Sequence, residues 1–485
     1  MGVGALLVEG EAEPKIMTRV FDWMPAAIWI VLVWAIAVLP NLSVRSFIWE
    51  EGTNAALARD ILASGDLLEP GIYGARWAEK PSLLPWLIAG AARLTGRVDE
   101  WSARLAPMLA VLLMALLVQR LTGRYATVPA SLFAAAAFMF CPLLLRKLTI
   151  SEPDTIITLL SFAAFVVWWR GEEAGRVTVW RWLACGVLLA ILAMAKGPQP
   201  VGFFALGVGS YLIACRRWAL PGLALCLALP AAATLAWAAA VYRVGDLPVW
   251  VGYMRLSIGI DLLRYLSERV RFAGGLSLDL LPSTMLLPFY LIPWWRRQHG
   301  TAAIPVIAPL LLYAGVCTLA LFFWPGANTR YAMPAAPAVA VLAGFAFDAL
   351  WHRGHLAARV AGAMAAILFA YQVALVTVAM PLFAERFGAT RQAGIALERA
   401  IGAAPAPVFT IGGPHTNELF YVAQPIRRVV DPLSRAITAP AWLLAPSAEV
   451  RQLEKLRPDL TARVVVETSA GPGLVAARLE RRSGP

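Results

Sequence analysis

Residues 24–66 have the sequence MPAAIWIVLVWAIAVLPNLSVRSFIWEEGTNAALARDILASGD, and their pattern is the strongest indication of the fold. It begins with an apolar run at 24–40, close to the ~20 residues that a helix needs to cross about 30 Å of hydrocarbon. Two adjacent carboxylates, Glu50 and Glu51, come next. Residues 51–64 then carry apolar side chains at helical spacing, which predicts an amphipathic helix lying in the membrane interface. The segment therefore predicts a membrane span followed by an ordered, charged outer loop.

The composition of the whole chain also indicates a membrane protein. Its 485 residues are 60% hydrophobic and 15% charged, whereas an ordinary soluble domain is about 45–50% apolar and about 25% charged. The same values exclude disordered, collagen-like and disulfide-rich chains. Membrane proteins collect Lys and Arg in cytoplasmic loops, which explains the net charge of +12, so we expect no nucleic-acid partner. The five cysteines show no metal-ligand spacing.

Ten further apolar runs follow the first one. Together they predict a mainly α, polytopic membrane protein with a bundle of about 11 transmembrane helices. The runs lie near 24–40, 103–119, 126–145, 154–169, 180–195, 198–215, 218–241, 277–295, 302–324, 331–350 and 359–381.

Arginines in alternate connectors predict how the bundle is oriented. The positive-inside rule places such connectors in the cytoplasm. We therefore expect a cytoplasmic N-terminus, with two long outer loops at 41–102 and 242–276 on the opposite face. The connectors hold Arg120 and Arg124, then Arg170, Arg176 and Arg181, then Arg216 and Arg217, Arg296 and Arg297, and Arg353 and Arg359.

The chain changes character at about residue 384. Residues 1–383 contain all the predicted spans, and the loop 41–102 carries a second short apolar helix at 81–95 that we also place in the interface. Residues 384–485 have short β-rich runs at 408–411, 429–430 and 464–466 and a helical patch at 449–456. We therefore predict a small soluble α/β C-terminal domain on the outer face.

Ionisable residues near the membrane mark candidate functional sites, because charged groups are costly there. Carboxylates suit a general base or a divalent-cation ligand, and cations suit a lipid phosphate. Each group alone also has a structural explanation, such as helix capping, an interface anchor or a lysine that snorkels. The groups on the predicted outer face are Glu50 and Glu51; Glu79 and Lys80; Arg146, Lys147, Glu152 and Asp154; Lys196; and Arg330 and Tyr331.

The type of substrate follows from where these groups gather. The cytoplasmic segments contain no Gly-rich nucleotide site. Carboxylates and cations instead share the outer face, beside the two interfacial helices. We therefore expect chemistry on a substrate that is itself in the membrane and carries an anionic head.

Motifs in the same segments resemble the GT-C glycosyltransferases that use polyprenyl-phosphate-linked sugars, namely the aminoarabinose transferases and protein O-mannosyltransferases. The first outer loop carries Glu50-Glu51-Gly-Thr-Asn, followed by Glu79-Lys80-Pro81 and Arg104-Leu-Ala-Pro107. Ala195-Lys196-Gly197-Pro198 and Arg330-Tyr331-(x)2-Pro334-(x)2-Pro337 match later motifs of the aminoarabinose branch in the same order. The resemblance covers about residues 25–350 and implies a GT-C-like bundle with a soluble outer domain.

The resemblance implies roles for several residues. The family's loop begins with an Asp-Glu pair whose Asp is taken as the general base, and Glu50 holds that position. Lys80 and Lys196 match lysines that contact the donor or its phosphate. Asp154 matches an outer-face carboxylate, and Tyr331 matches a tyrosine near the phosphate.

Two positions depart from the aminoarabinose pattern. Thr53 and Asn54 stand where those transferases usually have Arg and Tyr, so we expect a different sugar or acceptor. The predicted catalytic residues are Glu50, Glu51 and Asp154. Glu50 and Asp154 are also candidate ligands for a divalent cation, although the implied mechanism requires no cofactor. The predicted substrate-binding residues are Glu79, Lys80, Lys147, Glu152, Lys196, Arg255, Arg269, Arg330 and Tyr331.

The function implied is transfer of a sugar from a polyprenyl-phosphate donor to a lipid, glycan or protein acceptor, by inverting displacement with Glu50 as general base. We expect a multi-pass protein of the cell inner membrane whose active site faces the periplasm. Two alternatives stay open. A transporter or flippase of polyprenyl-linked sugars would share the phosphate-binding cations, and a non-catalytic relative would tolerate Glu50 in place of Asp.

Overall fold

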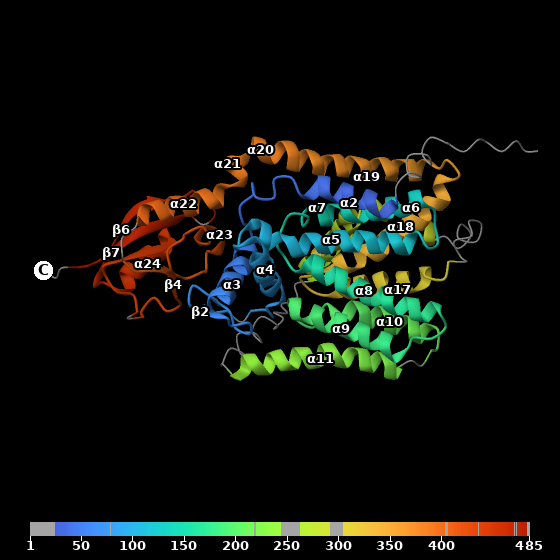
Figure 1. The fold of residues 1–485 in the computed structure, drawn as a ribbon, viewed down its shortest axis with the longest axis horizontal. Helices are drawn as coiled ribbons and strands as arrows, with labels where there is room; N and C mark the ends of the chain where they lie inside the picture. Colours follow the sequence, from blue (N-terminus) through green and yellow to red (C-terminus); the bar gives the residue numbers. More distant parts are fainter. Residues whose placement is uncertain are drawn as a thin grey trace, which may run out of the picture.

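The computed structural model describes residues 25–77, 79–217, 220–243, 262–291, 304–402, 406–434, 436–469, 471 and 473–482. Long helices run side by side as a bundle, and a small domain built on a sheet lies at one end of it (Figure 1). The predicted fold class, a helical membrane bundle with a C-terminal α/β domain, is confirmed.

Helices lie in all of the predicted apolar runs. Among the described residues, six helices are long and apolar enough to cross a membrane, and α13 with the following short helices makes a seventh candidate. The others are shorter, so the number of crossings remains a prediction. The bundle consists of α2 (Ala26–Val38), α5 (Glu100–Thr122), α6 (Val128–Met139), α7 (Pro142–Leu145), α8 (Asp154–Glu173), α9 (Val179–Lys196), α10 (Val201–Ala214), α11 (Leu220–Arg243), α13 (Leu262–Asp279), α14 (Ser283–Leu286), α15 (Pro288–Leu291), α17 (Ile307–Phe323), η2 (Thr329–Ala335), α18 (Ala336–Trp351) and α19 (Leu356–Ala374), which η3 (Leu375–Ala379) and α20 (Met380–Leu382) continue.

Burial separates central helices from peripheral ones. In the span that includes α18, 89% of the apolar window is buried, against 22% for α11 and 22% for the α19 span. Figure 1 shows α11 and α19 along opposite edges of the bundle. An apolar helix that stays exposed in this way is suited to contact with lipid.

The second predicted outer loop needs a correction. Residues 262–276, which we assigned to the loop, are helical and form most of α13. The helix stops shortly before Pro282, because a proline disfavours the helical conformation of the residue before it. The chain then bends by 97° into α14 and α15.

Both predicted interfacial helices are confirmed as helices. They are α3 (Glu51–Ser64) and α4 (Leu83–Thr95), and the hairpin of β1 (Gly71–Ile72) and β2 (Ala75–Arg76) joins them. Each helix ends at a glycine in the left-handed conformation, Gly65 at φ 76° and Gly96 at φ 85°, which a Cβ would disfavour. These elements lie between the bundle and the C-terminal domain (Figure 1).

The C-terminal domain contains a five-stranded sheet in the order β4-β3-β5-β7-β6. β3 pairs in parallel with β4 and β5, and β7 pairs antiparallel with β5 and β6. The predicted strands at 408–411 and 464–466 and the helix at 449–456 are confirmed, whereas the predicted strand at 429–430 overlaps only the last residue of β4. The domain comprises α21 (Ala384–Phe387), α22 (Ala389–Ile401), β3 (Val408–Ile411), α23 (Thr416–Leu419), β4 (Ile426–Val429), β5 (Ala441–Pro446), α24 (Ser447–Leu456), β6 (Leu460–Glu467) and β7 (Leu474–Arg481).

Different ion pairs lie at the two ends of the bundle. At one end, Arg124 pairs with Glu173 at 3.0 Å and Arg217 pairs with Glu172 at 2.5 Å. At the other end Glu100, the first residue of α5, pairs with Arg391 of α22 at 2.6 Å. The arginine-bearing connectors at Arg124 and Arg217 thus lie at the end remote from the C-terminal domain.

The tyrosine hydroxyl of Tyr421 joins the C-terminal domain to the bundle. It accepts a hydrogen bond from the Phe47 backbone N–H at 2.9 Å and donates one to Glu100 Oε1 at 2.7 Å. Tyr421→Phe should therefore lower the free energy of unfolding by about 1–3 kcal/mol, because it leaves buried partners unsatisfied. Thermal unfolding in detergent measures this effect. Tyr371→Phe, which alters an exposed tyrosine on α19, is the control, and equal melting temperatures for the two variants would contradict the prediction.

Candidate active site

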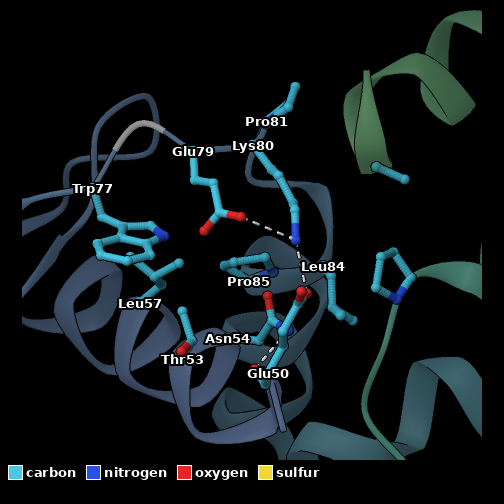
Figure 2. A pocket seen from close by; sticks show the side chains of 12 residues that line it. Glu50, Thr53, Asn54, Leu57, Trp77, Glu79, Lys80, Pro81, Leu84 and Pro85 are labelled. Carbon is cyan, nitrogen blue, oxygen red and sulfur yellow. Dashed lines mark hydrogen bonds and ion pairs between the residues drawn. The ribbon is translucent and has the colours of Figure 1, made fainter. Parts of the chain in front are cut away.

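An open pocket of about 490 Å³ lies at the end of the bundle nearest the C-terminal domain. Its walls come from the first half of α3, the segment after β2, the start of α4, and the ends of α8 and α9 that meet there (Figure 2). The pocket therefore joins segments that are far apart in the sequence. It is lined by Glu50, Thr53, Asn54, Leu57, Trp77, Glu79, Lys80, Pro81, Leu84, Pro85, Pro153 and Ala195.

Glu50 and Lys80 form the charged centre of this pocket. Lys80 Nζ lies 2.8 Å from Glu50 Oε2 and 3.4 Å from Glu79 Oε1. The Glu50 side chain is 45% exposed, so its carboxylate is accessible to a substrate. Burial lowers the pKa of Lys80, but the two neighbouring carboxylates outweigh burial and raise it. Lys80 is therefore held as an ammonium ion beside an accessible carboxylate.

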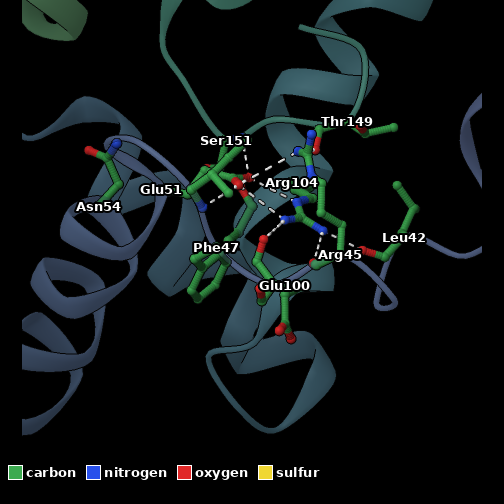
Figure 3. A network of polar contacts seen from close by, with 12 residues as sticks. Leu42, Arg45, Phe47, Glu51, Asn54, Glu100, Arg104, Thr149 and Ser151 are labelled. Atoms are coloured by element: carbon green, nitrogen blue, oxygen red, sulfur yellow. Dashed lines mark hydrogen bonds and ion pairs between the residues drawn. The ribbon is translucent and has the colours of Figure 1, made fainter. Parts of the chain in front are cut away.

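Glu51, by contrast, is fully buried and points away from the pocket into a polar network (Figure 3). Arg104 of α5 contacts both of its oxygens, with Nε 2.8 Å from Oε1 and Nη2 3.1 Å from Oε2. The backbone N–H of Ser151 donates to Glu51 Oε1 at 2.8 Å, and that of Ile48 donates to Glu51 Oε2 at 3.2 Å. These contacts satisfy the carboxylate completely, so its geometry is that of a structural anchor.

Arg104 extends this network to the first outer loop. Its guanidinium also donates to the carbonyl oxygens of Leu42, Arg45 and Ser46. A buried guanidinium with several acceptors fixes the path of the chain that leads to α3, because each lost contact would leave a buried polar group unpaired. One side chain thus joins α5, the segment 42–46 and the start of α3.

A second pair of ionised groups lies behind the pocket. Asp154, the first residue of α8, accepts from Lys196 Nζ at 2.6 Å. Lys196 lies 5.4 Å from the centre of the Tyr331 ring, which is within the range of a cation–π contact. Pro153 and Ala195, the chain neighbours of this pair, line the pocket that Glu50 and Lys80 also line, so the pair adjoins the pocket wall.

Lys147 and Glu152 form a third, buried pair. The Lys147 ammonium lies 3.9 Å from Asp154 Oδ2 and 5.0 Å from the ring centre of Trp49. Burial raises the pKa of Glu152, and the charges on Asp154 and Glu50 raise it further, against the opposing effect of Lys147. The structure thus brings the predicted group 147–154 to the same site.

Trp49 adopts an unusual backbone conformation next to Glu50. Its φ is +53°, a left-handed value that costs a bulky residue of order 1–3 kcal/mol. Such strain persists only where surrounding contacts enforce it. The backbone that carries Glu50 is therefore held in position rather than free to relax.

The remaining predicted residues are distributed differently. Arg330 and Tyr331 lie in η2, which packs on α8 beside Asp154. Arg269 is buried away from the pocket, where it donates to the carbonyl oxygens of Phe322 and Trp324 at the C-terminal end of α17. Arg269 thus caps a helix, a contact that spacing along the sequence could not indicate. Arg255 lies outside the described residues.

The predicted cation site does not fit this arrangement. Among the described residues, no group of three or more His, Cys, Asp or Glu side chains is placed to hold a metal ion. Glu50 and Asp154 are each paired with a lysine instead. We therefore derive no chemical step through a metal.

Several residues of the site were given no role by the sequence. Arg104 stood within a family motif, yet nothing in its spacing indicated that it binds Glu51. Trp77 lines the pocket from the end of the β1–β2 hairpin, and a lone tryptophan carries no signal of that kind. Asn417, from the C-terminal domain, contacts the first turn of α3 across 365 residues of sequence.

Comparison with known proteins agrees with the resemblance seen in the motifs. Residues 79–239 match the family model described as dolichyl-phosphate-mannose-protein mannosyltransferase. An undecaprenyl phosphate-α-4-amino-4-deoxy-L-arabinose arabinosyl transferase from Edwardsiella ictaluri is 28% identical over 212 residues, covering 42% of this chain and 36% of that protein. A similarly named transferase from Sodalis glossinidius is 28% identical over 191 residues, covering 38% of this chain and 34% of that protein. The chain thus aligns with about a third of each relative.

The structural match is more extensive. The crystal structure of ArnT from Cupriavidus metallidurans in the apo state aligns with a TM-score of 0.69 and 16% identity, covering 93% of this chain and 96% of that one. The structure of the same protein bound to undecaprenyl phosphate aligns with a TM-score of 0.69 and 17% identity, covering 95% of this chain and 98% of that one. The chain has the ArnT fold. The predicted resemblance to the aminoarabinose transferases is confirmed in sequence and in fold.

In this ArnT-like chain, the Glu51–Arg104 pair should contribute strongly to stability. Arg104→Met removes the cation that neutralises the buried Glu51 carboxylate. We therefore expect the free energy of unfolding to fall by about 3–5 kcal/mol. The double variant Glu51→Leu/Arg104→Met should lose less than the sum of the single variants. Thermal unfolding measures all three. Arg97→Met, at a guanidinium that is 79% exposed, should change stability by less than about 1 kcal/mol, and strictly additive losses at 51 and 104 would contradict the coupling.

The same carboxylate makes stability depend on pH. Burial alone would raise the pKa of Glu51, but Arg104, Arg45 and the Ser151 N–H outweigh burial and hold it below the usual value of 4.5. A lowered folded-state pKa contributes stability above the unfolded-state pKa, and this contribution is lost as pH falls through the folded value. Melting temperatures between pH 7 and pH 3 should therefore fall more steeply for the wild type than for Glu51→Gln. Parallel curves would rule out this contribution.

Proposed function

We propose that the chain is a membrane glycosyltransferase that moves a sugar from a polyprenyl-phosphate donor to an acceptor hydroxyl or phosphate. The observation that carries the proposal is the accessible Glu50 carboxylate 2.8 Å from Lys80, beside the Asp154–Lys196 pair. A base and a cation in one pocket, with further cations near its wall, are the groups that such a transfer needs. The names of the curated relatives, which are undecaprenyl-phosphate sugar transferases, support the donor class.

The reaction is an inverting displacement. Glu50 takes the proton of the acceptor O–H group, and the acceptor oxygen forms a bond to the anomeric carbon. The bond from that carbon to the phosphate oxygen breaks, and its electron pair leaves with polyprenyl phosphate. Lys80 places a positive charge 2.8 Å from the base, which supports a role in positioning the donor phosphate against the acceptor.

Cations stabilise the leaving phosphate in this mechanism. Lys196 and Arg330 both contact the Tyr331 ring, and Lys147 lies 3.9 Å from Asp154, the partner of Lys196. Preorganised positive charge is most effective where negative charge develops on the leaving group. Asp154 orients Lys196, and Glu51 holds the Glu50 backbone without touching the substrate.

The membrane orientation is part of the proposal. The pocket and the C-terminal domain lie at the end of the bundle opposite Arg124 and Arg217, and the positive-inside rule assigns that arginine-bearing end to the cytoplasm. The active site then faces the periplasm from the inner membrane. The acceptor is a lipid, a glycan or a protein.

A transporter of polyprenyl-linked sugars is the second candidate. Transporters bind their substrates near the bilayer midplane, on broken helices related by internal repeats. Here the charged groups of the candidate site lie at one end of the bundle, which favours an enzyme. A non-catalytic relative would have no need for an accessible carboxylate at position 50.

Glu50→Gln should reduce transfer by at least about a hundredfold, because a positioned general base contributes roughly 10²–10⁴ to the rate. The assay gives purified protein in nanodiscs a panel of polyprenyl-phosphate sugars with candidate acceptors and measures the release of polyprenyl phosphate. Glu50→Asp, which restores the residue of the related family, should keep measurable transfer.

The control is Glu480→Gln, at an exposed carboxylate of β7, and it should leave the rate unchanged. Near-normal transfer by Glu50→Gln would remove Glu50 from the role of base. Binding of lipid-linked sugars without release by the wild type would favour the transporter.

A further inference from the structure

The C-terminal domain is docked directly on the part of α3 that carries Glu50. The short helix α23 contacts the first turn of α3 through two neighbouring side chains. Thr416 Oγ1 lies 2.8 Å from Thr53 Oγ1, and Thr53 lines the pocket. Thr53 is one of the positions where the aminoarabinose pattern is not followed, and in this chain its hydroxyl contacts the C-terminal domain.

Asn417 holds the backbone on both sides of Glu50. Its Oδ1 accepts from the Gly52 N–H at 3.1 Å, and its Nδ2 donates to the Trp49 carbonyl at 3.0 Å. Glu50, the N-cap residue of α3, offers no capping side chain of its own. Asn417, which belongs to the C-terminal domain, therefore caps the N-terminus of α3 by accepting from the Gly52 N–H. Its second hydrogen bond holds the strained backbone of Trp49 in place.

Position 52 has no room for a side chain because Asn417 lies against it. A Cβ at position 52 would lie 2.7 Å from the backbone nitrogen of Asn417 and 2.7 Å from its Oδ1, closer than non-bonded atoms approach. The absence of a side chain there allows the two domains to meet. A Cβ added at Gly90 of α4 would meet no atom within 4 Å, so this glycine offers a matched comparison.

The C-terminal domain also contacts the β1–β2 hairpin and Trp77, which lines the pocket. The Arg428 N–H of β4 donates to the Tyr73 carbonyl of the hairpin at 2.8 Å. The Arg428 guanidinium lies 5.4 Å from the centre of the Trp77 ring, and Trp77 lines the pocket just before Glu79 and Lys80. The domain thus contacts the segments that present both the carboxylate and the ammonium.

We propose that the C-terminal domain is a working part of the active site, in which Asn417 is a positioning residue that fixes Glu50 relative to Lys80. This inference rests on the proposed function, because it assigns Asn417 to the same reaction. Asn417 does not touch the substrate. It acts through the backbone of residues 49–52, whose displacement would move the carboxylate away from the acceptor.

The test compares Asn417→Ala with the wild type in the polyprenyl-phosphate release assay on the full chain. We expect kcat to fall roughly ten- to a hundredfold, the order of loss that a misplacement of about 1 Å produces. The KM for the donor should change by less than about twofold, because Lys80, Lys196 and Arg330 are untouched. Asn417→Asp keeps an acceptor for the Gly52 N–H and should recover part of the rate.

Two further variants separate positioning from general loss of structure. Gly52→Ala should also lower kcat, because the added Cβ would lie 2.7 Å from backbone atoms of Thr416 and Asn417 and would separate α3 from α23. Gly90→Ala and Ser447→Ala are the controls and should keep wild-type kinetics. Ser447 makes an exposed hydrogen bond to Glu467 within the C-terminal domain. Wild-type kcat in Asn417→Ala, or equal loss in the controls, would overturn the proposal.

Amide hydrogen exchange provides a readout that does not depend on activity. In Asn417→Ala the amides of residues 49–53 should exchange faster than in the wild type, whereas in Ser447→Ala they should not. If the wild type itself releases no polyprenyl phosphate, the proposed function fails, and exchange still decides whether Asn417 holds the segment. Unchanged exchange at residues 49–53 would overturn the positioning role.

Discussion

The buried contact between Arg104 and Glu51 is the interaction on which the site depends. Both side chains are fully buried, and an unpaired charge at that depth would be strongly destabilising. The guanidinium also binds three carbonyl groups of the segment 42–46, and the carboxylate binds the Ser151 N–H. The contact therefore fixes the start of α3 against α5 and against the segment that leads into α8.

Two adjacent glutamates are separated by this contact into different environments. Successive residues of a helix point about 100° apart, and here Glu51 enters the interior while Glu50 faces the pocket. Glu50 pairs with Lys80, which lies in the segment after the β1–β2 hairpin. The strained Trp49 is the local cost of that geometry, and contacts with Lys147 and Asn417 hold it.

The pocket is completed from three directions. The bundle provides Pro153 and Ala195, next to the ion pair of Asp154 and Lys196. The segment 41–102 provides Glu50 and Lys80, and the C-terminal domain holds the backbone beside Glu50. Loops positioned by a rigid scaffold commonly carry function. In this protein the scaffold includes a domain whose sequence carries no catalytic motif.

From the sequence one could predict the class of protein, the apolar runs, the helices at 51–64 and 83–95 and the charged groups at Glu50, Lys80, Asp154 and Lys196. These follow from hydrophobicity and periodicity, which are local properties of the chain. Tertiary structure alone decided which carboxylate of the Glu50–Glu51 pair is accessible, that Arg269 caps a helix, and that Asn417 contacts α3. Those outcomes depend on partners between 53 and 365 residues away, and side-chain spacing along one segment contains no information about such partners.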